Sequence, residues 1–178
     1  MSTIKINDKE FVPYLTNDEL QQTIKDLAER VYEDYKEEVP IFIGVLNGVI
    51  MFFSDFLKYY KGNCEIAFMQ VSSYEGTEST GIVKKRMELS KNVENRHIVL
   101  MEDIVDTGNT LEAILEHFSR ELKPKSIRTA SLLFKREVFK KDFQVDYIAK
   151  EIPNKFVLGY GLDYDELGRN LPDLYQLK

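Results

Sequence analysis

The sequence predicts a single α/β domain with a parallel, doubly wound sheet flanked by helices. Short apolar runs, typical of strands buried on both faces, alternate with segments whose apolar residues recur at helical spacing. The chain has 178 residues and contains no internal repeat, low-complexity tract or Pro/Gly/Ser-rich linker. This length is typical of one domain, and the strand–helix alternation indicates a parallel sheet.

The first half of the chain predicts two helices and two strands. Thr16 and Glu19 have the spacing of a capping box, and an apolar stripe at helical spacing follows them. We therefore expect a helix over 16–38 that ends before Pro40. The other elements expected here are a strand at 41–46, a turn at Asn47-Gly48, a helix at 49–60 and a strand at 66–72.

The second half repeats the pattern after a long polar segment. Residues 74–90 show no clear period and predict a long loop, and such loops inside compact domains are usually functional. The elements expected after it are a strand at 98–101, a helix that runs to about Leu122 before Pro124, and strands at 127–134, 145–149 and 156–160.

Composition excludes several classes of protein. The net charge is −6, without the basic excess that a nucleic-acid-binding surface usually carries. Cys64 is the single cysteine, which excludes a disulfide framework and a cysteine-rich metal site. The apolar runs are shorter than a membrane span, and the first ten residues are polar and charged, unlike a cleavable signal. We therefore expect a cytoplasmic protein that binds neither nucleic acid nor a membrane.

The most informative segment runs from Val99 to Leu111. An apolar strand leads into the carboxylates Glu102 and Asp103, and Asp106 follows three residues later. The next residues, Thr107 to Thr110, open an amphipathic helix, and Gly108 among them allows close backbone approach. A helix N-terminus offers unpaired backbone N–H groups and the positive end of the helix dipole, which favour an anion. Carboxylates instead suit sugar hydroxyls or a hard cation such as Mg²⁺. The segment therefore predicts a site for a phosphorylated sugar.

Polar residues also follow three other predicted strands. These stretches are 47–48, 73–76 and 135–136. Because ligands of doubly wound sheets bind beyond the carboxyl ends of the strands, we expect these stretches to lie near residues 102–110. From local residues alone, Asn47-Gly48 fits an ordinary turn as well as an anion cradle, and 73–76 fits an exposed hairpin better than a lid.

The segment Glu-Asp-Ile-Val-Asp-Thr-Gly-x-Thr at 102–110 resembles the phosphoribosyl pyrophosphate (PRPP) motif of the type I phosphoribosyltransferases, most closely that of the hypoxanthine-guanine branch. The resemblance runs from about residue 40 to 170 and includes five motif regions in the family's order. It implies transfer of a phosphoribosyl group from PRPP to a 6-oxopurine, with Mg²⁺ as cofactor and with a homodimer or homotetramer as the assembly. It also implies one domain over 1–178, with a core at about 36–150, a small hood from about 1–15 and 151–178, and a mobile flap at about 73–90.

The resemblance also implies roles for individual residues. Asp106 is the catalytic residue that takes or shares the N7 proton of the base, and Glu102 and Asp103 act with it on the ribose hydroxyls. The residues implied for the 5′-phosphate are Asp106, Thr107, Gly108, Asn109 and Thr110, and those for pyrophosphate are Leu46, Asn47, Gly48 and Arg169. The residues implied for the base are Lys135 at O6, Phe156 as a stacking ring, Val157 at the base edge and Asp163. Those implied for Mg²⁺ are Glu102, Asp103 and Asp163. Those implied for the lid are Ser73 and Tyr74.

Two positions depart from the family pattern. Asn47 stands where many members of the family carry lysine, and Asn109 stands where some members do. A role of that lysine charge therefore does not transfer to this chain.

Two alternative functions stay open at this point. One is a phosphoribosyltransferase that prefers xanthine or another base, since no residue that reads the purine 2-position is apparent. The other is a PRPP-sensing regulator that binds nucleic acid, which the acidic balance disfavours.

Overall fold

The computed structural model describes residues 2–74, 84–89 and 91–178. In this part of the chain the main sheet has six strands in the order β5-β4-β3-β6-β7-β8. Its five parallel strands are β3 (Ile41–Leu46), β4 (Glu65–Tyr74), β6 (His97–Val105), β7 (Ser126–Phe134) and β8 (Tyr147–Glu151), and β5 (Lys84–Leu89) pairs with β4 in the antiparallel direction. The predicted parallel sheet is confirmed.

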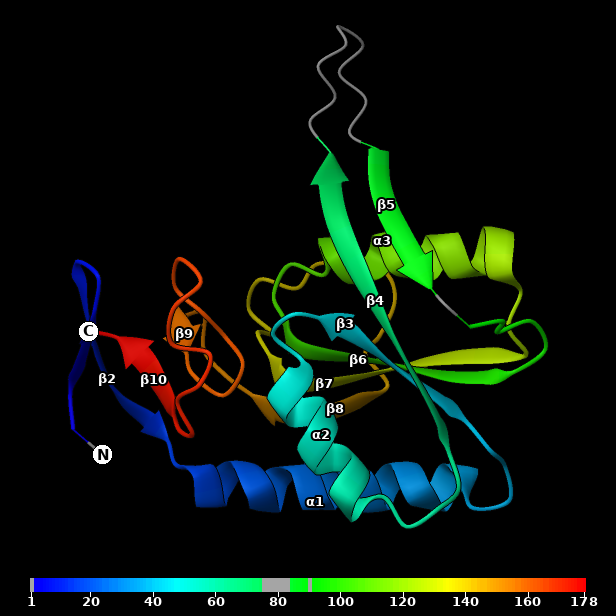
Figure 1. Cartoon of the computed structure of the whole chain (residues 1–178), viewed down its shortest axis with the longest axis horizontal. Coiled ribbons are helices and arrows are strands. Elements are labelled where there is room, and N and C mark those ends of the chain that lie inside the picture. Colours follow the sequence, from blue (N-terminus) through cyan, green and yellow to red (C-terminus); the bar gives the residue numbers. More distant parts are fainter. Residues whose placement is uncertain (1, 75–83, 90) are drawn as a thin grey trace, which may run out of the picture.

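Helices cover both faces of this sheet (Figure 1). On one side lie α1 (Asn17–Tyr35) and α2 (Ile50–Tyr59), and on the other lies α3 (Asn109–His117), which continues as a wider π-helical turn, η1 (Phe118–Leu122). Side chains alternate along the buried strands: in β6, Val99 packs on the α1–α2 side and Leu100 on the α3 side. The doubly wound arrangement follows from this two-sided burial.

A second, antiparallel sheet joins the two ends of the chain. Its order is β1-β2-β10-β9, formed by β1 (Ile4–Ile6), β2 (Lys9–Leu15), β10 (Leu174–Leu177) and β9 (Val157–Leu158). Figure 1 shows this small sheet beside the main one, with the blue N-terminal strands next to the red C-terminal strand. A hood built from the N- and C-terminal segments is therefore present.

Most predicted elements occur, with three differences. The Thr16–Glu19 capping box is formed and α1 follows it, but the helix ends at Tyr35. The prediction of a loop throughout 74–90 was wrong at 84–89, where backbone pairing with β4 makes a strand of a polar segment. The flap predicted at 73–90 otherwise falls mainly on residues 75–83 and 90, outside the described residues. The strands β1, β2 and β10 were not predicted.

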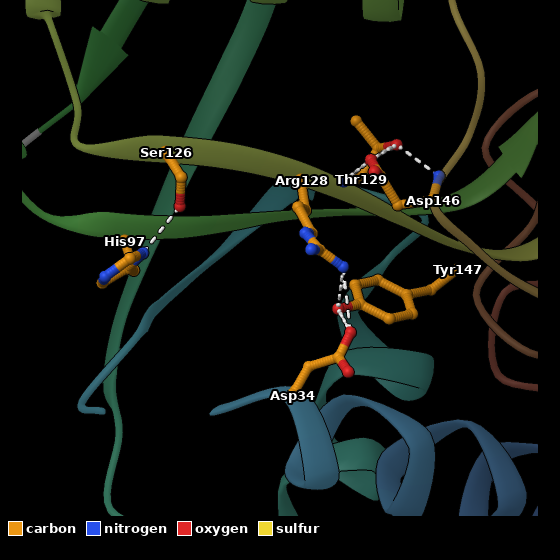
Figure 2. A network of polar contacts seen from close by, with 7 residues as sticks. All are labelled: Asp34, His97, Ser126, Arg128, Thr129, Asp146 and Tyr147. Carbon is orange, nitrogen blue, oxygen red and sulfur yellow. Dashed lines mark hydrogen bonds and ion pairs between the residues drawn. The ribbon is translucent and has the colours of Figure 1, made fainter. Parts of the chain in front are cut away.

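Polar contacts fasten α1 to the sheet at the amino ends of its strands (Figure 2). Arg128 of β7 donates to Asp34 of α1 over 2.9 Å and to the Tyr147 hydroxyl over 3.0 Å. Nearby, Asp146 accepts from the backbone N–H and the hydroxyl of Thr129, at 2.8 and 2.9 Å. These contacts fix β7 against β8 and α1. None of the described helices has the length and apolar character needed to cross a membrane.

Candidate active site

The carboxyl ends of β3, β6 and β7 meet at one edge of the main sheet. β6 lies between β3 and β7, and all three strands are parallel. The chain passes from β3 to β4 on one side and later returns to β6 on the other, so the direction of winding reverses between β3 and β6. Doubly wound sheets bind ligands at such a reversal. Residues 47–48, 102–106 and 135 are therefore brought to the same edge.

The first cavity at this edge lies at the N-terminus of α3. Its volume is about 110 Å³, and its lining includes Glu102, Asp106, Thr107, Gly108, Asn109 and Thr110. Gly108 is the N-cap of α3 with φ of +82°, a backbone conformation that favours glycine, and no side chain caps the helix there. The first backbone N–H groups of α3 consequently lack a side-chain acceptor, as an anion-binding helix terminus requires.

The second cavity lies beside the first and has a volume of about 260 Å³. Its lining comprises Asp103, Ile104, Asp106, Lys135, Phe156, Val157, Leu162 and Asp163. Asp106 thus lines both cavities. Phe156 is 43% exposed, so its ring is not part of the core and is available to an aromatic ligand. A flat apolar wall, a cation and a carboxylate together suit a heteroaromatic base.

Lys135 and Asp106 form an ion pair inside this second cavity. The Nζ atom of Lys135 donates to Oδ2 of Asp106 over 2.8 Å. Lys135 is 7% exposed, whereas the side chain of Asp106 is 48% exposed. The backbone N–H of Lys135 also donates to the carbonyl of Val105 over 3.0 Å, which extends the β6–β7 pairing into the site. The structure therefore places a donor and an acceptor side by side in the lining of the second cavity.

Burial raises the pKa of both carboxyl groups at the end of β6. The Glu102 side chain is buried, and removal from water, assisted by the nearby Asp103, holds its pKa well above the usual range. Burial raises the pKa of Asp103 to about 6, against the lowering effect of the Ile104 backbone N–H, which donates to Oδ1 over 2.8 Å. Arg169 lowers the pKa of Asp103 and Asp163 raises it. A cation bound here would relieve the cost of ionising either group.

Two glycine contacts bring the end of β3 and the C-terminal segment against Asp103. A β-carbon on Gly48 would lie 1.7 Å from Oδ2 of Asp103, and one on Gly161 would lie 2.0 Å from the carbonyl oxygen of Gly48. Arg169 donates to the carbonyl of Gly161 over 3.0 Å and pairs with Asp163 at 2.8 Å. The carboxylate, the turn after β3 and the arginine therefore occupy one corner of the site.

The acidic groups predicted as metal ligands are divided between the two cavities. Glu102 lines the first, and Asp103 and Asp163 line the second. Among the residues described by the structure, no three His, Cys, Asp or Glu side chains converge as a metal site built from protein alone. Mg²⁺ usually binds one or two carboxylates together with substrate phosphates and water. Asp103 and Asp163 provide such a donor pair, so the residues fit an ion shared with a phosphorylated substrate.

Some predicted residues stand apart from the two cavities. Leu46 and Asn47 precede Gly48, and the side chain of Asn47 is exposed. Ser73 and Tyr74 end β4, but their side chains lie outside the described part of the structure. Arg169 reaches the site through Gly161 and Asp163 rather than through either cavity lining.

Sequence reasoning missed three contributors to the site. Ile104 and Leu162 line the base cavity, and Gly161 carries φ of +100° at its contact with Gly48. The signal available for Ile104 is its position at a strand end, directly after a predicted site carboxylate. The pair Gly159 and Gly161 directly after a short strand is the available signal for a tight turn.

Comparison with known proteins identifies the family. The model of the phosphoribosyl transferase domain matches residues 14–165. A hypoxanthine-guanine phosphoribosyltransferase of Staphylococcus epidermidis is 41% identical over 165 residues, 92% of each chain. The Aquifex aeolicus protein of the same name is 36% identical over 176 residues, 98% of each chain.

Solved structures agree with the sequence relatives. The crystal structure of a hypoxanthine-guanine phosphoribosyltransferase from Bacillus anthracis has a TM-score of 0.84 and 33% identity, covering 94% of this chain and 96% of that one. A hypoxanthine phosphoribosyltransferase from Staphylococcus aureus has a TM-score of 0.84 and 40% identity, with 94% and 91% covered. The chain therefore belongs to the phosphoribosyltransferase family, in the branch of the hypoxanthine-guanine phosphoribosyltransferases.

Proposed function

We propose that the protein transfers the 5-phosphoribosyl group of PRPP to hypoxanthine and/or guanine, giving IMP or GMP and pyrophosphate in purine salvage. The observation that carries this proposal is the Lys135–Asp106 pair, which lines a cavity suited to a base, while Asp106 also lines the neighbouring cavity suited to a phosphate. In the reaction the N9–C1′ bond forms, and the bond from C1′ to pyrophosphate breaks with its electron pair leaving on pyrophosphate. The proton on N7 of the base passes to Asp106.

Base recognition rests on the adjacent donor and acceptor. O6 and N7 lie side by side on one edge of a 6-oxopurine. Lys135 donates to O6 while Asp106 accepts the proton of N7, and the ring lies against Phe156. Adenine presents an amino group at position 6, so the Lys135 ammonium would meet another donor instead of an acceptor. A buried donor left unmet costs about 1–3 kcal/mol, which supports selection of 6-oxopurines.

The 5′-phosphate binds the N-terminus of α3. We assign this role to Asp106, Thr107, Gly108, Asn109 and Thr110, which line the first cavity and offer backbone N–H and threonine hydroxyl donors. The carboxylate of Asp106 faces the base rather than the phosphate, while its backbone belongs to the loop. Asn109 carries no charge, so backbone N–H groups and the helix dipole supply most of the attraction for the phosphate.

The ribose hydroxyls and pyrophosphate occupy the acidic end of the site. We assign Glu102 and Asp103 to the ribose, and Leu46, Asn47, Gly48 and Arg169 to pyrophosphate. The planar, five-donor guanidinium suits phosphate oxygens. Mg²⁺ is the proposed cofactor, and Asp103, Asp163 and Glu102 are the residues that would hold it. When bound, the ion would neutralise charge on the leaving pyrophosphate.

Further parts of the proposal concern water exclusion and assembly. Ser73 and Tyr74 open the lid that keeps water from the reacting carbon. The proposed divisions are a core at about 36–150, a hood at about 1–15 and 151–178, and a flap at about 73–90. We propose a homodimer or homotetramer in the cytoplasm, acting on small molecules and not on nucleic acid.

The test is an assay of PRPP and Mg²⁺ with hypoxanthine, guanine, xanthine and adenine side by side. The proposal expects nucleotide and pyrophosphate from hypoxanthine, guanine or both, little product from adenine, and loss of activity when EDTA removes Mg²⁺. Product mainly from xanthine would replace the assignment with a xanthine-preferring enzyme. A gel shift on nucleic acid at physiological salt together with no product from any base would favour a regulator instead.

A further inference from the structure

Two lysines of the loop between β7 and β8 pair with two carboxylates around the phosphate-binding turn. Lys135 contacts Asp106 at 2.8 Å, and Lys141 contacts Glu112 at 2.7 Å. The lysines are six residues apart, and so are the carboxylates. We call residues 135–141 the lysine loop and residues 106–110 the phosphate loop. The lysine loop is therefore attached at one end to Asp106 of the phosphate loop and at the other to Glu112 in the first turn of α3.

The middle of the lysine loop packs directly on the phosphate loop. A β-carbon on Gly108 would lie 2.5 Å from Cε2 of Phe139 and 3.1 Å from Cγ of Lys141. Phe139 is itself held by the rings of Phe134 and Phe143, with centroids 5.1 and 5.4 Å away. The αL turn at Gly108, which starts α3, is thus supported from outside by an aromatic ring and the stem of a lysine.

The charge of Glu112 gives Lys141 a second effect. Glu112 lies in the first turn of α3, the same turn whose backbone N–H groups face the first cavity. A free carboxylate there would repel a bound phosphate, and the phosphate loop itself contains no lysine or arginine. The side chain of Lys141 is 18% exposed, compared with 45% for Glu112, so the lysine is largely removed from solvent. Its charge offsets that of Glu112 near the anion.

We propose that Lys141 is a positioning residue for the reaction: it holds the phosphate loop through Gly108 and neutralises Glu112, and thereby sets the affinity for the phosphate of PRPP. This inference rests on the proposed binding of the 5′-phosphate by residues 106–110. Lys141 acts through Glu112 and Gly108 and touches no reacting atom.

The test compares Lys141→Gln, Glu112→Gln, the double variant and Lys141→Arg in the complete chain. Calorimetry measures PRPP binding with Mg²⁺ present, and steady-state kinetics separate KM for PRPP, KM for the base and kcat. In Lys141→Gln we expect Kd and KM for PRPP to rise about three- to tenfold, with less effect at high salt. Glu112→Gln should bind PRPP at least as tightly as the unmodified protein, and the double variant and Lys141→Arg should recover most of the affinity. The KM for the base should stay constant throughout.

The neighbouring exposed lysine gives a matched control. Lys140→Gln removes the same charge one residue away and should leave PRPP binding unchanged. Unchanged PRPP binding in Lys141→Gln, or a double variant as weak as Lys141→Gln alone, would overturn the inference. If Lys141→Gln fails to fold, Glu112→Gln decides, since weaker PRPP binding in that variant contradicts the proposed repulsion. Absence of PRPP binding in the unmodified protein would overturn the proposed function and this inference together, whereas normal PRPP turnover with an unaffected Lys141→Gln overturns this inference alone.

Discussion

The Nζ atom of Lys135 lies 2.8 Å from Oδ2 of Asp106, although the two residues directly follow different strands and are 29 positions apart. Parallel pairing of β6 with β7, in register from His97 to Val105, sets this relationship. Because Lys135 is nearly buried, the carboxylate offsets its charge when no base is bound. In the proposed reaction, a bound base would take the place of this pair, with Lys135 donating to O6 and Asp106 accepting from N7.

Replacing Asp106 by Asn tests the proton acceptor. The amide introduced by Asp106→Asn would keep the shape of the side chain but not its basicity, so we expect kcat to fall by about 10²–10⁴-fold. Binding of PRPP should change far less, because the backbone of the phosphate loop is retained. Kinetics with saturating hypoxanthine, together with calorimetry for PRPP, measure the two effects. Asp142→Asn, at an exposed acid of the β7–β8 connection, is the control. Equal turnover in Asp106→Asn would remove this residue from the chemistry.

Replacing Lys135 by Met tests base selection. Methionine preserves the length of the side chain and removes the donor to O6. Loss of about 1–3 kcal/mol corresponds to a decrease of roughly 5- to 150-fold in kcat/KM for hypoxanthine. The ratio of hypoxanthine to adenine activity should narrow, which the four-base assay measures directly. Lys140→Met should behave like the unmodified protein. A variant that keeps the full preference for hypoxanthine would show that another group reads position 6.

The sequence predicted elements whose information is local and missed elements that depend on distant partners. The run 41–46 is apolar at almost every position and became the central strand β3, and the capping box at Thr16 marked the start of α1. By contrast, β5 is polar and depends on pairing with β4, and β10 pairs with β2 from the opposite end of the chain. No local pattern encodes such pairings.

The same division holds within the site. The strand-end rule was sufficient to gather Asp103, Asp106 and Lys135 around one cavity. The packing of Gly161 on Gly48 and the attachment of Lys141 to Glu112 depend on how two irregular segments fold back. Side-chain spacing along the chain contains neither relationship, so only the three-dimensional structure reveals them.

Replacing Gly161 by Ala tests the contact between the C-terminal segment and the turn after β3. The new β-carbon would meet the Gly48 carbonyl at 2.0 Å, and φ of +100° disfavours any side chain. A backbone cost of about 1–2 kcal/mol lowers Tm by roughly 2–8 °C in a chain of this length. Displacement of Gly48 and Arg169 should also raise KM for PRPP. Gly62→Ala is the control for a Gly-to-Ala change, because φ there is not positive and the three atoms nearest the new β-carbon, at 2.9 Å or more, all belong to the side chain of Tyr60. A Gly161→Ala protein with normal Tm and normal KM would mean that this contact is not needed.

The buried carboxyl of Asp103 makes the stability of the substrate-free, Mg²⁺-free protein depend on pH. Its folded-state pKa is about 6 and its ordinary value 3.8, so between these values the folded state binds more protons than the unfolded state. The free energy of unfolding therefore falls as pH rises through about 6, and the contribution is complete below about 4. Neighbouring Glu102 acts in the same direction, because burial raises its pKa too.

Thermal unfolding in EDTA at pH 5.0 and 7.5 measures this effect. The surface carboxylates whose pKa is lowered, such as Glu65 and Glu151, stay ionised across this interval and contribute little to the difference. The Asp103→Asn variant differs from the unmodified protein only at this side chain, so the comparison isolates its contribution. We expect Tm to fall more between pH 5.0 and 7.5 in the unmodified protein than in Asp103→Asn. We also expect that adding Mg²⁺ with PRPP restores Tm at pH 7.5 only in the protein that retains Asp103. Identical pH dependence in the two proteins would mean that Asp103 ionises as freely in the folded chain as in water.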